Sequence, residues 1–139
     1  MISMEAIYTA AATANGREGR AVSSDGTLDL ALAMPPAMGG TGEGTNPEQL
    51  FAAGYAACFA SALGLVGRQA KVDTKDIAVT AEVSIGKDET SFALSVVLRV
   101  ELPEGLENET GQQLVKAAHE VCPYSKATRG NIPVELVVE

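Results

Sequence analysis

Two cysteines and one histidine are the residues of this chain whose types and spacing suggest chemistry. Cys58 lies in NPEQLFAAGYAACFASAL, and Cys122 lies 64 positions later in HEVCPYSKATRG, three residues after His119, the only histidine. A thiolate is a nucleophile and a redox centre, and a histidine one helical turn away could act as its base. Each residue also has a structural interpretation. Cys58 could be a small core thiol, Cys122 the end of a helix, and His119 a half-buried side chain at a helix C-terminus.

The number and spacing of these residues argue against two other kinds of site. Two cysteines and one histidine cannot complete a tetrahedral zinc site, so no metal is expected. The chain has no CxxC motif, which argues against a thioredoxin-type centre. Both cysteine segments carry polar side chains without an obvious structural role, which favours a redox function for the pair: Glu48, Gln49, Tyr124, Ser125 and Arg129.

Composition limits the class of protein. With 139 residues the chain predicts one domain, 1–139, large enough for a hydrophobic core. The net charge of −8 argues against a nucleic-acid partner, which requires a basic face. The first twenty residues contain no apolar segment typical of a secretory signal. We therefore expect a cytoplasmic protein, in which a disulfide is transient and chemical rather than structural.

The elements that must position the cysteines follow an α+β pattern, β-β-β-α-β-β-α-β. Asn15-Gly16 and Asp25-Gly26 are favoured in tight hairpins and predict a meander of three strands before the Pro/Gly-rich loop 35–46. The remaining predicted elements are a helix over 46–67, strands over 76–86 and 91–101, a helix over 106–122 and a strand over 132–138.

The first predicted helix is apolar around nearly its whole circumference. Residues 50–66 carry no charge, but the segment is rich in Ala, Gly and Ser, and it predicts a helix buried in a soluble protein rather than a membrane span. Because so small a chain has few elements to cover such a helix, we expect a second copy to do so in a homodimer.

Apolar side chains surround Cys58 in sequence and predict a substrate pocket. Such a pocket favours bulky apolar substrates over small polar ones, and it admits a thin, flexible molecule more easily than a folded protein. The predicted pocket residues are Phe51, Tyr55, Phe59, Met34 and Met38.

Three segments resemble the organic hydroperoxide resistance proteins, the Ohr branch of the Ohr/OsmC family. They are YTAAATANGREGRAVSSDG, TNPEQLFAAGYAACF and AHEVCPYSKATRGNIPVELVV. Tyr55 and Tyr124 stand where the sister OsmC branch differs. The resemblance implies an OsmC-like fold and a tightly intertwined homodimer with sites at the interface. It also implies a thiol-dependent peroxidase that acts in oxidative-stress resistance, for which the apolar pocket predicts a preference for organic or fatty-acid hydroperoxides over hydrogen peroxide.

The same resemblance implies roles for four residues. Cys58 matches the peroxidatic cysteine and Cys122 the resolving cysteine, with which it forms a disulfide. Arg17 matches the arginine that contacts the thiolate, and Glu48 matches the glutamate that holds this arginine. Arg20 lies close enough in sequence to remain an alternative to Arg17. No bound cofactor is implied, and the implied reductant is dihydrolipoamide on a lipoylated protein.

A different class of function remains open on the residues alone. A noncatalytic dimer could bind a lipid-like ligand or a regulatory partner in its apolar cleft, with both cysteines structural. The two hypotheses differ in whether one equivalent of hydroperoxide converts both thiols to an intrachain disulfide.

Overall fold

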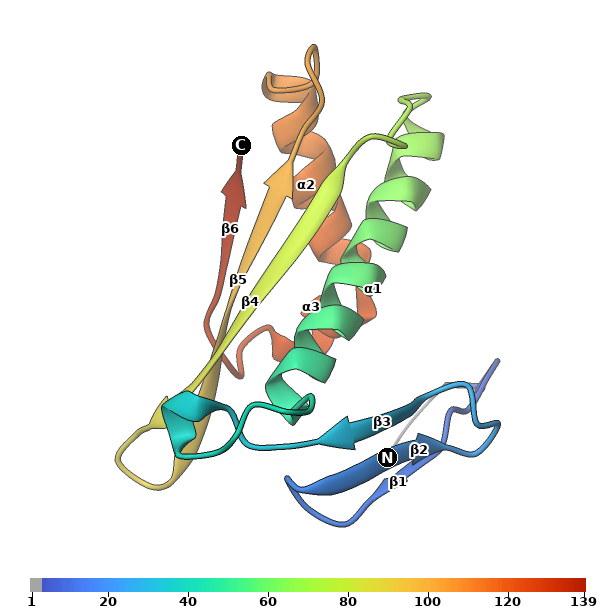
Figure 1. Ribbon diagram of the computed structural model, residues 1–139. Coiled ribbons are helices and arrows are strands. Elements are labelled where there is room, and N and C mark those ends of the chain that lie inside the picture. Colours follow the sequence, from blue (N-terminus) through green and yellow to red (C-terminus); the bar gives the residue numbers. More distant parts are fainter. Residues whose placement is uncertain (1–3) are drawn as a thin grey trace. The chain divides into compact units, whose positions relative to one another are not determined.

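The computed structural model describes residues 4–139, which form two compact units that divide after Pro47 (Figure 1). Each unit has its own three-stranded sheet. The α+β class and the predicted order of elements are confirmed, with one additional short helix near the C-terminus. The prediction of a single domain over 1–139 remains a prediction.

The first unit is the predicted meander. It consists of β1 (Ala12–Ala14), β2 (Gly19–Ser23) and β3 (Asp29–Leu32), paired antiparallel in that order. The turn between β2 and β3 is stabilised by Asp25, whose carboxylate accepts hydrogen bonds from the Ser23 hydroxyl and the Thr27 amide. Gly26 follows with a φ of 76°, a conformation that glycine adopts without steric cost. The Pro/Gly-rich loop contains a short 3₁₀ helix, η1 (Pro36–Met38).

The second unit packs helices on one face of a mixed sheet (Figure 1). β4 (Ala78–Lys87) pairs antiparallel with β5 (Phe92–Glu101), and β5 pairs parallel with β6 (Val134–Val138). Because a parallel pair needs a crossover, the chain between β5 and β6 carries α2 (Glu109–Val121) and α3 (Pro123–Thr128). The remaining helix, α1 (Pro47–Gln69), precedes β4.

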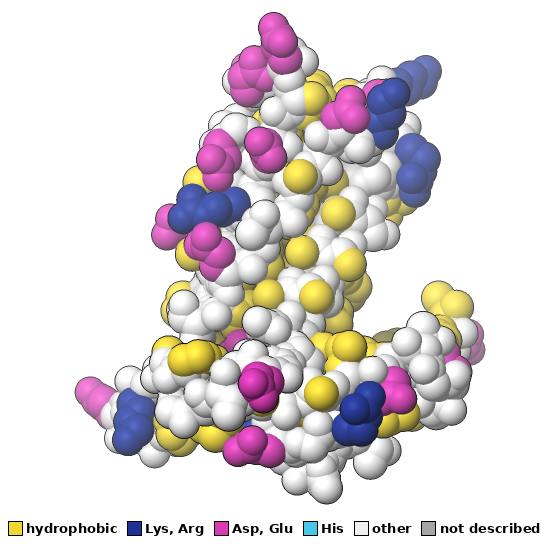
Figure 2. Space-filling model, viewed as in Figure 1, with side chains coloured by type: hydrophobic (Ala, Val, Ile, Leu, Met, Phe, Trp, Pro, Cys, Tyr) yellow, Lys and Arg dark blue, Asp and Glu magenta, His cyan; other side chains and the backbone are white. Residues whose placement is uncertain are grey.

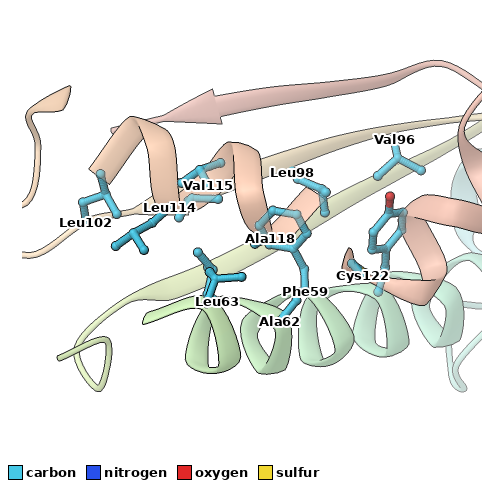
Figure 3. Close-up of a cluster of buried hydrophobic side chains, with 13 residues drawn as sticks. Phe59, Ala62, Leu63, Val96, Leu98, Leu102, Leu114, Val115, Ala118 and Cys122 are labelled. Atoms are coloured by element: carbon cyan, nitrogen blue, oxygen red, sulfur yellow. The ribbon is translucent and has the colours of Figure 1, made fainter. Parts of the chain in front are cut away.

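The core lies between the two long helices and β5 (Figure 3). The buried side chains of α1 recur at helical spacing: Tyr55, Phe59, Ala62, Leu63 and Val66. The buried side chains of β5 recur at every second residue, as one face of a strand requires: Val96, Leu98 and Val100. α2 contributes Leu114, Val115 and Ala118. Cys122 belongs to the same core cluster, so its position is set by close packing.

Local signals explain where α2 begins and ends. Asn108 caps its N-terminus by accepting hydrogen bonds from the amides of Thr110 and Gly111. At the other end Cys122 is extended, with φ −66° and ψ 122°, because a residue before proline avoids the helical region. Pro123 ends α2 and also redirects the chain, since it is the first residue of α3.

Burial of α1 within the chain is confined to one stripe. The opposite face is accessible and includes Leu65, which is 42% exposed. Figure 2 shows hydrophobic side chains along the accessible face of this helix, with few charges among them. Of the residues described, α1 alone is long and apolar enough to cross a membrane, and 33% of its most apolar window is buried within the chain. One such helix is weak evidence of a span, because core helices of soluble proteins have the same length and composition.

Candidate active site

The fold brings the two cysteines together. Cys122 Sγ donates a hydrogen bond to Cys58 Sγ across 3.7 Å, although 64 positions separate the residues in sequence. Both are free thiols; Cys122 is completely buried and Cys58 is partly exposed. A disulfide requires a sulfur–sulfur distance of about 2.05 Å, so a shift of less than about 2 Å would allow the bond to form. The more accessible thiol is therefore the one that a substrate can reach first.

Regular structure accounts for this meeting. Cys58 lies midway along α1, next to Phe59 of the buried stripe. Cys122 lies at the break between α2 and α3, where the extended residue before proline ends one helix and begins the next.

The surroundings of Cys58 act on its pKa in opposite directions. Burial raises the pKa of the thiol above its ordinary value, the backbone N–H of Tyr124 lowers it by donating a hydrogen bond to the sulfur, and the neighbouring Cys122 raises it further. The net direction is upward. A nucleophilic thiolate at neutral pH therefore needs an additional positive or hydrogen-bonding group near Cys58.

His119 makes its side-chain hydrogen bond to a hydroxyl. Its Nδ1 lies 2.8 Å from Ser125 Oγ, and its ring centroid is 6.5 Å from that of Phe59. Burial lowers the pKa of His119, the positive charge of Arg129 lowers it further, and Glu120 opposes both. The possible pairing of His119 with Cys122 as a nucleophile and its base thus gives way to a pairing with Ser125.

Aromatic side chains lie beside the thiols. Phe51 stacks on Tyr124 with ring centroids 6.0 Å apart, and Tyr55 lies 5.8 Å from Phe51 and 5.7 Å from Tyr124. Tyr55 and Phe59, both predicted to line a pocket, have no exposed surface in the chain and belong to its core. Phe51 is partly buried and Tyr124 is 39% exposed, which leaves both able to contact a ligand.

A hydrogen-bonded group of side chains next to Cys122 was not predicted from the sequence. The Tyr55 hydroxyl lies 2.9 Å from Ser125 Oγ and 3.1 Å from Thr128 Oγ1, and Ser125 is shared with His119. Ser125 was noted as a polar residue without a structural role, and it now has one. Nothing in the sequence separates Thr128 from an ordinary helix-end threonine, because the 73 positions between it and Tyr55 are closed only by folding.

The remaining predicted site residues lie in the first unit, except Glu48, which is the first residue of the second unit. Arg17 lies in the turn between β1 and β2 and is half-buried, as are Met34 and Met38 around η1. Arg20 is bound to Asp29 on the neighbouring strand, with its Nε and Nη2 donating to Oδ1 at 2.8 and 2.6 Å. Glu48 lies in the first turn of α1, where a carboxylate interacts favourably with the helix dipole.

The described part of the chain contains no evident metal site. Across residues 4–139 no three His, Cys, Asp or Glu side chains are grouped closely enough to hold an ion.

Comparison with known proteins gives the family. Residues 40–137 match the family model described as OsmC-like protein. An organic hydroperoxide resistance protein of Xanthomonas axonopodis pv. citri is 52% identical over 135 residues, which cover 95% of this chain and 94% of that protein.

Two solved structures are also similar over nearly their whole length. An organic hydroperoxide resistance protein of Vibrio cholerae has a TM-score of 0.92 at 51% identity, covering 99% of this chain and 95% of that one. OhrB of Bacillus subtilis has a TM-score of 0.86 at 48% identity, covering 96% and 100%. The chain therefore belongs to the OsmC-like family, in the branch of the organic hydroperoxide resistance proteins, as its cysteine segments predicted.

Proposed function

We propose that this protein is a cysteine-based peroxidase that reduces organic hydroperoxides, including those of fatty acids, to alcohols. The observation that carries the proposal is the 3.7 Å separation of the Cys58 and Cys122 sulfurs, one partly exposed and the other completely buried. The names of the relatives support a role in hydroperoxide detoxification, and the paired thiols supply a chemical means for it.

The reaction begins with the thiolate of Cys58. Its sulfur attacks the hydroxyl oxygen of the hydroperoxide, the O–O bond breaks, and the organic oxygen leaves and takes up a proton to become an alcohol. Cys58 is then a sulfenic acid. Cys122 attacks this sulfur, the S–O bond breaks, and water leaves as the Cys58–Cys122 disulfide forms. The thiol pair has lost the two electrons that the peroxide gained.

Arg17 and Glu48 have the proposed role of activating this centre. At about pH 7.5 an ordinary thiol with a pKa of about 8.5 is already roughly one-tenth thiolate, so lowering that pKa gains only about tenfold. Burial raises the pKa of Cys58, so a positive neighbour must lower that pKa further to give the same fraction of thiolate. The rest of the acceleration comes from orienting the peroxide and stabilising the departing oxygen, which a guanidinium fork held by a carboxylate can do. Arg20 is bound to Asp29, and Arg17 is the arginine that matches the motif of the resembling proteins, so Arg17 is the proposed active arginine.

The apolar surroundings of Cys58 support the proposed substrate and reductant. Phe51 and Tyr124 offer aromatic surface beside Cys58, and Met34 and Met38 stay predicted pocket residues. Each methylene buried by a substrate adds about 0.8 kcal/mol, which favours bulky hydroperoxides. A buried Cys122 limits access to its disulfide, so the proposed reductant is a narrow dithiol, dihydrolipoamide carried on a lipoylated protein.

A homodimer is part of the proposal. The accessible face of α1 is apolar, and a second chain that covered it would remove side chains such as Leu65 from water. Sedimentation equilibrium tests this proposal. A dimer is expected for the unaltered chain, with dissociation promoted by Leu65→Glu. A monomer at all concentrations would contradict it.

Intact-mass measurement without reductant tests the function directly. One equivalent of cumene hydroperoxide should lower the mass of the chain by two hydrogen atoms, because both thiols are converted to a disulfide. The hydroperoxide should become cumyl alcohol. If both thiols persist while the hydroperoxide is bound or ignored, the protein is a binding module and the proposal is wrong. The proposed donor is tested by whether dihydrolipoamide, and not thioredoxin, reduces the Cys58–Cys122 disulfide. Cell fractionation tests the proposed cytoplasmic location.

A further inference from the structure

Four polar side chains next to the thiols form one connected group, which we call the Tyr55 network. Its members are Tyr55 from α1, His119 from α2, and Ser125 and Thr128 from α3. Tyr55 and Ser125 have no exposed surface and Thr128 is 4% exposed. In such a setting an unpaired hydroxyl is costly, so every donor and acceptor in the group must be used consistently.

Because each hydroxyl has one hydrogen, the donor and the acceptor in every hydrogen bond of the network can be assigned. The Thr128 hydroxyl donates to the Ser125 carbonyl oxygen at 3.1 Å, and a hydroxyl has only one hydrogen. Thr128 Oγ1 must therefore accept from the Tyr55 hydroxyl, which in turn must accept from Ser125 Oγ. Ser125 has then used its own hydrogen, so the Nδ1 of His119 must carry a hydrogen and donate it.

We propose that the Tyr55 network is a directional hydrogen-bonded relay that fixes His119 as the Nδ1–H tautomer and positions Cys122 and the Tyr124 N–H against Cys58. Its four members are positioning residues, since none is in hydrogen-bond contact with a cysteine sulfur in the network described. The inference about disulfide formation rests on the proposed function, whereas the inference about the tautomer does not.

The network can position the thiols because it ties three helices together around them. Cys122 lies between His119 and Ser125 in sequence, and both of these neighbours are held by the network. Arg129 adds a second tie, since its Nη2 donates to the His119 carbonyl oxygen at 2.6 Å and so fastens the end of α3 to α2. The Tyr124 amide, adjacent to Ser125, donates to the Cys58 sulfur. A chain of hydrogen bonds with one direction is also cooperative, which stiffens it.

Nitrogen NMR tests the relay without any peroxide. Since His119 is the only histidine, ¹⁵N-histidine labelling gives one imidazole, whose two nitrogens report directly which of them is protonated. Above neutral pH, where the ring is uncharged, the Nδ1–H tautomer is expected. An Nε2–H tautomer in the unaltered chain would overturn the relay.

Two variants that each remove one hydroxyl should reverse the tautomer. Without an acceptor at position 55, Tyr55→Phe leaves Ser125 free to donate to Nδ1. In Thr128→Val the Tyr55 hydroxyl loses its acceptor at position 128 and can donate to Ser125 instead. Ser125 can then donate to Nδ1, which gives the Nε2–H tautomer of His119. Thr128→Ser keeps the hydroxyl, and Tyr8→Phe alters an exposed tyrosine, which is 80% exposed; both should retain the Nδ1–H form. Retention of Nδ1–H in both Tyr55→Phe and Thr128→Val would overturn the relay.

A thiol–disulfide equilibrium with glutathione tests whether the network positions Cys122 against Cys58. In it Cys58 and Cys122 give two electrons and two protons to glutathione disulfide, which becomes two glutathione molecules. Tyr55→Phe and Thr128→Val should lower the effective concentration of the thiol pair roughly tenfold, while Thr128→Ser and Tyr8→Phe should change it by less than about twofold. An unchanged equilibrium with a reversed tautomer would overturn the positioning role alone. If glutathione disulfide oxidises the thiol pair normally but hydroperoxide does not, the proposed function is wrong and the relay stands.

Discussion

The sulfurs of Cys58 and Cys122 lie 3.7 Å apart, in hydrogen-bond contact, with Cys122 completely buried and Cys58 partly open to solvent. This asymmetry distinguishes the two thiols. In the proposed mechanism, a hydroperoxide therefore reacts with Cys58, and Cys122 reacts afterwards with the oxidised Cys58. The predictions below depend on that difference and on the groups around the pair.

The cysteines should have different mutant phenotypes. Cys58→Ser is expected to abolish peroxide turnover, because it removes the accessible nucleophile. Cys122→Ser should consume about one equivalent and stop at a sulfenic acid on Cys58, since no thiol is present to resolve it. Peroxide consumption and mass spectrometry after dimedone trapping measure both. If the two variants behaved alike, the assignment of roles would be wrong.

Arg17→Lys should lose far more activity than Arg20→Lys. Lysine keeps the charge but lacks the planar fork that can orient a peroxide beside a thiolate while bound to Glu48. Arg20 is instead paired with Asp29 on the exposed surface of the first sheet, where such pairs contribute little. Steady-state kcat/KM on cumene hydroperoxide compares the two. A larger loss at Arg20 would assign the active arginine to β2.

Substrate and donor preference should follow the apolar site. Turnover is expected to be faster with cumene or fatty-acid hydroperoxides than with hydrogen peroxide, and faster with a lipoyl system than with thioredoxin or glutathione. The physical reasons are the burial of apolar substrate surface and the enclosed position of Cys122. Assays with each donor on each peroxide provide the measurement. A preference for hydrogen peroxide or for thioredoxin would indicate an open, polar site.

His119 should make folding stability depend on pH. Burial and Arg129 lower its pKa in the folded chain, so the unfolded chain binds the proton more tightly. The stabilisation is therefore fully present above the ordinary pKa of about 6.5 and is lost as the pH falls through the lower folded value. The slope contributed is at most about 1.4 kcal/mol per pH unit.

Urea unfolding of the unaltered chain and of His119→Asn between about pH 7.5 and pH 5 isolates this effect, since the chain has no other histidine. The variant keeps a donor near the position of Nδ1 and cannot titrate, so its free energy of unfolding should change less over this range. Equal pH dependence in both proteins would mean that His119 titrates normally.

Much of the fold could be predicted because local patterns agree with the tertiary structure. Asn15-Gly16 and Asp25-Gly26 marked the two hairpins of the first sheet, and alternating apolar residues marked β5. The position of Pro123 marked the break at which Cys122 lies. These features depend on backbone stereochemistry and on the period of helix or strand, which a sequence displays directly.

The sequence by itself also determined which residues could carry redox chemistry, since two cysteine segments have the types and surroundings that identify the family. Only the tertiary structure decided that Cys122 is buried while Cys58 is open, that burial raises the pKa of Cys58, and that His119 turns to Ser125 instead of a thiol. The Tyr55 network could not be predicted, because its partners are up to 73 positions apart. Such contacts arise from packing of helices against one another, and no local pattern records which hydroxyls that packing brings within hydrogen-bonding distance.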